Sequence, residues 1–150
     1  MELDLRMKCD RIPDNNHISR LCLPKHVQDN QIQATAFQLR SNENYLSVNW
    51  LEFLNCPGRE NEIEEIRKTY MENFNIGRRA KIAVLNVGEV RYKVLTESED
   101  GRNLEVCHEP EINDPSHSGI YNLKQGDELI AELILETVLE SYPARQMTYD

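Results

Sequence analysis

The chain has 150 residues, of which 39% are hydrophobic, and this is enough for one hydrophobic core but too short for two ordinary domains. Its formal net charge of −9 argues against bulk nucleic-acid binding, because such proteins gain most of their affinity from Lys and Arg on phosphates. The sequence contains neither an apolar run of roughly eighteen residues nor the apolar core of a signal peptide. We therefore expect a single cytoplasmic domain over residues 1–150, without membrane association.

The first part of the chain is poor in regular patterns. Residues 1–33 are predicted to be an irregular arm, because Asn, Asp and Gln are frequent and Pro13 and Pro24 interrupt any regular period. Apolar and polar side chains then alternate over residues 34–40 and again over residues 45–52, which predicts two half-buried strands. The polar stretch between them has turn character, so we expect these strands to form an antiparallel hairpin.

The middle of the chain carries one clear helix signal and several strand signals. Residues 59–74 have apolar side chains three or four apart, with Glu residues crowded into the first turns where the helix dipole favours them. Residues 80–87 form a nearly continuous apolar run, which is typical of a strand covered on both faces. Further strands are predicted at 90–96 and 103–108, with an Asp-Gly hairpin signal between them.

The last predicted element is a helix over residues 127–141 with Glu at every fourth position. Aliphatic residues fill most of the positions between these glutamates, so the helix has a narrow acidic stripe on an otherwise apolar surface. We interpret it as a core helix with one solvated ridge, or as a docking ridge for a basic partner. The candidate partner-binding residues on this ridge are Glu132, Glu136 and Glu140.

The order of these elements indicates the fold class. Strands are grouped in runs with helices between them, and strict alternation of strand and helix is absent. This arrangement favours an α+β domain with a mainly antiparallel sheet of about five strands and two helices on one face.

The cysteines are expected to be free thiols. There are four of them, and none forms a Cys-x-x-Cys pair. In a reducing cytosol such scattered cysteines are usually small buried apolar groups. Cys107 adjoins His108, but neighbours on a strand point to opposite faces, which gives little support to a nucleophilic cysteine.

Histidine is the residue type from which a chemical site is most readily built, because imidazole titrates near neutrality. His17 and Arg20 lie in the predicted N-terminal arm, and His117 follows a turn-like Asn-Asp-Pro-Ser segment. We predict these three as candidate catalytic residues, with one histidine as base, the other as acid, and Arg20 or Arg40 neutralising developing charge. Arg40 and His108 are candidate ligand-binding residues, although His108 also fits a structural role on its strand.

Zinc is the alternative that these residues leave open, because imidazole and thiolate are suitable ligands. The residues from which a zinc site could be drawn are His17, Cys22, His26, Cys107, His108 and His117. The short paired spacings of zinc fingers are missing, so we predict neither a metal nor another cofactor. Signature loops of the common nucleotide hydrolases, dinucleotide enzymes, serine hydrolases and zinc proteases are missing as well.

Residues 36–40 and 45–52, together with His17-Ile18-Ser19-Arg20, resemble a group of small bacterial proteins without assigned function, and the resemblance extends to residues 115–120. It implies a bacterial cytosolic protein and carries no activity, cofactor or catalytic residue.

The function expected from the sequence is that of a binding or accessory protein, whose target is a protein partner or a second copy of the chain. The alternative is a metal-independent enzyme or binder that uses His and Arg on a phosphate-containing ligand such as a nucleotide or RNA. The sequence leaves open whether the chain is an enzyme.

Overall fold

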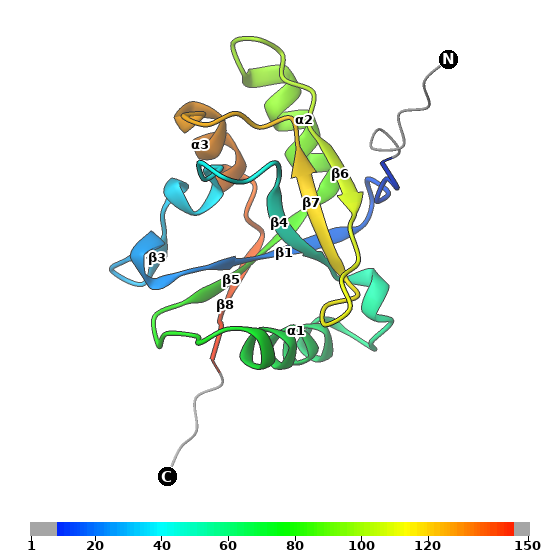
Figure 1. The fold of residues 1–150 in the computed structure, drawn as a ribbon. Coiled ribbons are helices and arrows are strands. Elements are labelled where there is room, and N and C mark those ends of the chain that lie inside the picture. The colour runs from blue at the N-terminus through cyan, green and yellow to red at the C-terminus, as the bar shows by residue number, and fades with distance from the viewer. Residues whose placement is uncertain (1–8, 146–150) are drawn as a thin grey trace.

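One antiparallel sheet with helices on both faces makes up the fold (Figure 1). The computed structural model describes residues 9–145, in which the six strands of this sheet are β1 (His17–Cys22), β4 (Leu46–Trp50), β5 (Lys81–Asn86), β6 (Glu105–His108), β7 (His117–Tyr121) and β8 (Glu140–Pro143). Their order across the sheet is β6-β7-β4-β1-β5-β8, and each neighbouring pair is antiparallel. The predicted α+β class with a mainly antiparallel sheet is confirmed, with six strands in place of five.

The helices lie in two layers. Helix α1 (Arg59–Asn73) covers one face of the sheet, and α2 (Val87–Glu97) and α3 (Glu128–Glu136) cover the other (Figure 1). The part of the chain that the structure describes thus has three helices on two faces, where two on one face were predicted. No helix within residues 9–145 has both the length and the apolar character needed to cross a membrane. The shorter elements are the 3-10 helices η2 (Pro24–His26), η3 (Ala34–Phe37) and η4 (Glu52–Leu54), and the hairpin of β2 (Val27–Gln28) and β3 (Gln31–Ile32).

Strand β5 separates the two cores. Ile82 and Val84 belong to the core beneath α1, whereas Ala83 and Leu85 belong to the core beneath α2 and α3. Because successive side chains of a strand point to opposite faces, a strand with helices on both sides must be apolar at almost every position. The prediction of a strand covered on both faces at residues 80–87 is confirmed.

Strand β1 corrects the prediction of an irregular N-terminal arm. Residues 17–22 lie in the middle of the sheet, between β4 and β5. Ile18 and Cys22 are fully buried, and the polar Ser19 and Arg20 are buried as well, with hydrogen-bond partners elsewhere in the fold. The polar composition that indicated a loop therefore belongs to a central strand whose polar groups are satisfied by tertiary contacts.

Two segments predicted as strands are helical. Residues 34–37 form η3, so β4 has no hairpin partner there and pairs with β1 and β7. Residues 90–96 lie within α2, where Val87, Val90 and Val94 are buried at helical spacing. The side chain of Asn86 caps this helix by accepting a hydrogen bond from the Glu89 amide at 2.8 Å. This cap and the tertiary burial of one helix face outweigh the strand preference of valine.

The predicted C-terminal helix is shorter than expected. Helix α3 ends at Glu136, and residues 140–143 form β8 beside β5. Glu140 therefore lies on an edge strand, where it accepts a hydrogen bond from Arg59 Nε at 3.1 Å. The acidic ridge of the helix ends at Glu136, so Glu140 does not continue it.

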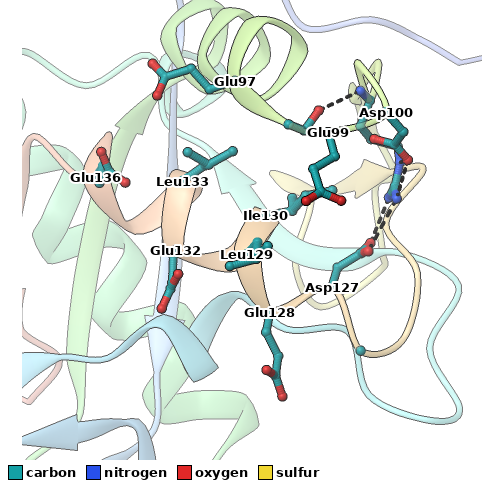
Figure 2. A pocket seen from close by; sticks show the side chains of 13 residues that line it. Glu97, Glu99, Asp100, Asp127, Glu128, Leu129, Ile130, Glu132, Leu133 and Glu136 are labelled. Carbon is teal, nitrogen blue, oxygen red and sulfur yellow. Dashed lines mark hydrogen bonds and ion pairs between the residues drawn. The ribbon is translucent and has the colours of Figure 1, made fainter.

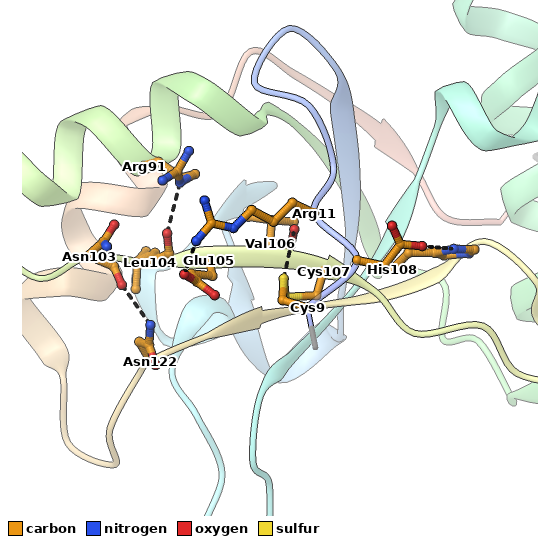
Figure 3. The surroundings of a disulfide bond; sticks show 11 residues. Cys9, Arg11, Arg91, Asn103, Leu104, Glu105, Val106, Cys107, His108 and Asn122 are labelled. Atoms are coloured by element: carbon orange, nitrogen blue, oxygen red, sulfur yellow. Dashed lines mark hydrogen bonds and ion pairs between the residues drawn. A yellow bond between two sulfur atoms is a disulfide. The ribbon is translucent and has the colours of Figure 1, made fainter. Parts of the chain in front are cut away.

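A disulfide joins the start of the described chain to β6 (Figure 3). The backbone hydrogen bonds Ile12 N to Val106 O and His108 N to Asp10 O align residues 10–12 along the edge of β6. This alignment places Cys9 beside Cys107, 98 residues away in sequence. The expectation of four free thiols is wrong for this pair, while Cys22 and Cys56 are free.

Candidate functional site

A pocket of about 730 Å³ lies on the α1 side of the sheet, at the end of that helix. Its walls come from β1, β4, β7, the last turn of α1 and the loop between β6 and β7. Three of the predicted site residues, Arg20, Arg40 and His117, line it. Polar side chains that the sequence did not single out line it as well, and these include Ser47, Asn49, Tyr70 and Asp114.

The pocket opens where two strands diverge. Residue pairing between β1 and β4 is confined to Ile18 with Trp50 and Ser19 with Asn49. Beyond this point the Arg20 side chain takes the place of the missing strand–strand hydrogen bonds. Its Nε donates to the Ala36 carbonyl at 2.9 Å, and its Nη1 donates to the Ser47 carbonyl at 2.9 Å. One guanidinium thus connects β1, η3 and β4.

The Arg20 guanidinium is a buried charge on a residue that lines the pocket. Only 7% of the residue is exposed, and burial lowers its pKa, although a guanidinium remains protonated in proteins. Nη2 has no hydrogen-bond partner within residues 9–145, yet no fully buried side-chain nitrogen there lacks a partner. Nη2 is therefore not fully buried, and it belongs to a residue that lines the pocket.

Arg20 also lacks an ion-pair partner among the described residues. Glu43, Glu111 and Asp114 line the same pocket, but none of their carboxylates lies within 4.0 Å of the guanidinium. Buried charges are normally paired, because removing a charge from water is expensive. The pocket therefore presents an unpaired positive charge to whatever enters it.

His117 is held in one orientation by two hydrogen bonds. Its Nδ1 lies 2.9 Å from the Glu109 carbonyl oxygen, and its Nε2 lies 3.3 Å from Ser47 Oγ. A carbonyl oxygen only accepts, so Nδ1 carries a hydrogen, and in the neutral form of the ring the lone pair of Nε2 faces the serine hydroxyl. The Tyr45 ring packs edge-on against the imidazole. Tyr45 fits there because Gly119 has no side chain, and an added Cβ would lie 2.3 Å from the Tyr45 ring.

The floor of the pocket is a connected polar network. The Tyr70 hydroxyl donates to Asn49 Oδ1 at 3.0 Å, and Asn49 Nδ2 donates to Asp114 Oδ1 at 2.7 Å and to Ser116 Oγ at 2.9 Å. Burial raises the pKa of the Tyr70 hydroxyl, which therefore stays neutral, and burial also raises the pKa of Asp114. These bonds hold the polar side chains in fixed positions before any ligand arrives.

The structure does not bring His17 into this pocket. Its Nδ1 lies 2.7 Å from Glu52 Oε2, and its backbone amide donates to the other oxygen of the same carboxylate. The two-histidine acid–base pair that the sequence suggested would need His17 and His117 to line one cavity, and His17 is not among the residues that line this one. His108 lies apart from it as well, with Nε2 2.8 Å from the Pro115 carbonyl oxygen and its ring against Trp50 and Phe53.

A second pocket, of about 600 Å³, is strongly acidic (Figure 2). It lies between the end of α2, the loop that follows, and α3. Arg102 is the one basic residue among the described residues that line it, and its guanidinium is bound to Asp100 at 2.9 Å and Asp127 at 2.7 Å. The seven acidic lining residues are Glu97, Glu99, Asp100, Asp127, Glu128, Glu132 and Glu136. Of the three predicted partner-binding residues, Glu140 lies outside this acidic pocket.

One group of metal-compatible side chains occurs within residues 9–145. Cys9, Glu105 and Cys107 place their ligand atoms within 4.8 Å of one another. The two sulfurs are joined in the disulfide and so offer no thiolate to a metal. The six residues considered for zinc do not form such a group in the described part of the chain.

Compared with known proteins, the chain matches no protein-family model, no curated protein and no solved structure. The two pockets are therefore the features from which a function can be inferred.

Proposed function

We propose that the protein binds a small phosphate-bearing ligand in the pocket of Arg20. The observation that carries this proposal is the buried Arg20 guanidinium, which lines the pocket and has no carboxylate of residues 9–145 within 4.0 Å. A phosphate oxygen at Nη2 would give this charge the partner that residues 9–145 do not supply. The volume of about 730 Å³ falls in the range typical of small-molecule sites.

The other charges of the pocket support a small ligand over a polymer. Arg40 is exposed at the pocket and supplies a second positive charge. Glu43, Glu111 and Asp114 line it too, and they would repel a long polyanion at every additional phosphate. A single phosphate group beside Arg20, with neutral parts of the ligand near Asn49, fits this mixed lining better than RNA does.

Isothermal titration calorimetry with inorganic phosphate and pyrophosphate tests the proposal. Arg40→Gln removes an exposed pocket charge without disturbing the core, and it is expected to weaken binding about five- to tenfold. Arg79→Gln is the matched control, because Arg79 is exposed and does not line the pocket. Absence of binding at millimolar phosphate, or equal effects of the two substitutions, would overturn the proposal.

Docking of a basic protein segment in the acidic pocket is a second candidate function. Seven acidic residues line it, its one arginine is already paired, and the neighbouring Leu129 is 62% exposed. Such a surface is complementary to a Lys- and Arg-rich partner with some apolar character. Titration with an octalysine peptide should show salt-dependent binding that is lost in the double variant Glu128→Lys and Glu132→Lys. Glu72→Lys, an exposed change on α1, should bind the peptide as the wild type does.

The cytoplasm of a bacterium is the location that we propose from the resemblance of residues 36–40 and 45–52 to small bacterial proteins. The Cys9–Cys107 disulfide argues in the other direction, because disulfides persist mainly in oxidising compartments. Acid quenching of intact cells, followed by alkylation of the denatured protein without reduction and by mass analysis, separates the two. A reducing cytosol predicts four alkylated cysteines, whereas an oxidising compartment predicts two.

A further inference from the structure

The Ser47 hydroxyl lines the pocket, but the proposed binding of phosphate does not use it. Within residues 9–145 its one hydrogen-bond partner is His117 Nε2, 3.3 Å away. The buried serines nearby are engaged with other groups: Ser19 with the Tyr70 hydroxyl, Ser116 with Asp114 and Ser118 with the Ser116 carbonyl. Ser47 is also partly exposed and lines the pocket, so a ligand can reach its oxygen.

The geometry around Ser47 reproduces the arrangement of an activated nucleophile. Such an arrangement needs a base within hydrogen-bond reach of the hydroxyl, and a further group that orients the base. His117 is that base, because the Glu109 carbonyl holds the hydrogen on Nδ1 and leaves the lone pair of Nε2 facing Ser47. Glu111 Oε2, 3.9 Å from Nδ1, would stabilise the imidazolium that forms when His117 accepts a proton.

A positive charge adjoins the same serine. Arg20 Nη1 donates to the backbone carbonyl of Ser47, which fixes the guanidinium beside the residue whose hydroxyl faces His117. Because Arg20 and Ser47 both line the pocket, the positive charge of the guanidinium would help to stabilise negative charge that develops on a group attacked by Ser47. The pocket thus combines a base, a hydroxyl and an anion-stabilising group.

We propose that Ser47 is a nucleophile for phosphoryl transfer from a phosphate ester, with His117 as general base and acid. This inference rests on the proposed phosphate site. Ser47 Oγ gives its proton to His117 Nε2 and forms a bond to phosphorus, while the bond from phosphorus to the ester oxygen breaks. The departing alcohol takes the proton from His117. Water, deprotonated by His117, then attacks the phosphorus of the phosphoserine, the bond from phosphorus to Oγ breaks, and His117 returns the proton to Oγ, which releases phosphate and restores Ser47.

Covalent labelling of the full chain with diisopropyl fluorophosphate tests the nucleophile directly. Ser47 is expected to displace fluoride and gain one diisopropylphosphoryl group, located by intact mass and peptide mapping. Ser47→Ala should take no label at this position. His117→Gln should react at least about a hundredfold more slowly, the usual contribution of a general base. Ser41→Ala, a change of an exposed serine that does not line the pocket, should react as the wild type does.

Two further measurements separate the outcomes. Thermal unfolding of His117→Gln shows whether the variant is folded at the temperature of the labelling. If it is folded, slow labelling reflects the lost base. A folded His117→Gln protein that labels at the wild-type rate overturns the proposal. Phosphate calorimetry on the same samples distinguishes the two proposals of this pocket. Binding of phosphate without labelling of Ser47 overturns the nucleophile and leaves the binding site, whereas labelling without phosphate binding overturns the phosphate site and this substrate class.

Discussion

The Arg20 side chain binds the backbone carbonyl of Ser47 at 2.9 Å, where β1 and β4 no longer pair. A charged side chain thereby performs a structural task that a backbone amide performs elsewhere in the sheet. The same contact brings the positive charge to the strand that carries Ser47 and Asn49. Arg20 therefore has a structural role and a role in the proposed phosphate binding. Substitutions of Arg20 and of other pocket residues separate its effect on stability from the effect on binding.

Arg20→Lys is expected to lower the free energy of unfolding by about 1–3 kcal/mol. A lysine ammonium is compact and cannot reproduce the fork that reaches the Ala36 and Ser47 carbonyls together. Urea denaturation measures the loss, and Arg79→Lys, at an exposed position, should change stability by less than about 0.5 kcal/mol. Equal midpoints for the two variants would show that the bridge across the diverging strands contributes little.

Asp114→Asn is expected to stabilise the protein near neutral pH. Burial raises the pKa of Asp114 in the folded state, although the nearby His117 and the Asn49 hydrogen bond oppose this. A carboxyl with a raised folded pKa contributes its full stability below its unfolded pKa and loses it as pH rises through the folded pKa. The uncharged Asn side chain escapes that loss and can still accept the hydrogen bond from Asn49.

Denaturation of both proteins at several pH values checks this sign. The stability difference in favour of Asp114→Asn should grow between about pH 3 and pH 7. A difference that shrinks over this interval would mean that the folded protein favours the charged carboxylate. Phosphate should also bind more tightly to the variant, because one negative charge has left the pocket.

His17→Gln is expected to leave phosphate binding unchanged, because His17 does not line the pocket. The substitution should instead lower the free energy of unfolding by about 1 kcal/mol, since it disturbs the hydrogen bond to Glu52. Calorimetry and urea denaturation on His17→Gln and His117→Gln separate the two histidines. Equal losses of phosphate affinity in both variants would restore the two-histidine site that the sequence suggested.

Cys9→Ser is expected to lower the free energy of unfolding by about 2–4 kcal/mol under oxidising conditions. The disulfide closes a long loop, with a sequence separation of 98 between its two cysteines, and so restricts the unfolded chain strongly. Cys56→Ser, at a partly exposed free thiol, is the control and should have little effect. Thiol titration of the unfolded wild type that finds four free cysteines would contradict the disulfide itself.

The spacing of apolar residues in the sequence predicted α1, which is apolar on one face, and β5, which is apolar on both faces. It missed β1, because the buried Ser19 and Arg20 are satisfied by Tyr70 and Ala36, which are distant in sequence. Such polar strands look like loops until their partners are known. In α2 the spacing of the valines fits a helix, and Asn86 is a recognisable cap, so this helix could have been predicted.

The candidate pocket was predictable only in part. Arg20, Arg40 and His117 were singled out by residue type, and the structure places all three in one pocket. Ser47 was missed because the alternation of residues 45–52 indicates only that it points away from Leu46 and Val48. Its importance arises from the divergence of β1 and β4 and from the ladder that sets His117 opposite Asn49. Neither relationship has a local sequence signal.

The loop over residues 109–116 couples access to the pocket with the chemistry inside it. Through Asn113 it touches Asn73 at the end of α1, and through the Glu109 carbonyl it decides which nitrogen of His117 carries the hydrogen. A displacement of this segment large enough to admit a bulky ligand would also free the imidazole to change tautomer. Access to the pocket and the tautomer of His117 thus depend on one short stretch of backbone, so a substitution there would alter both together.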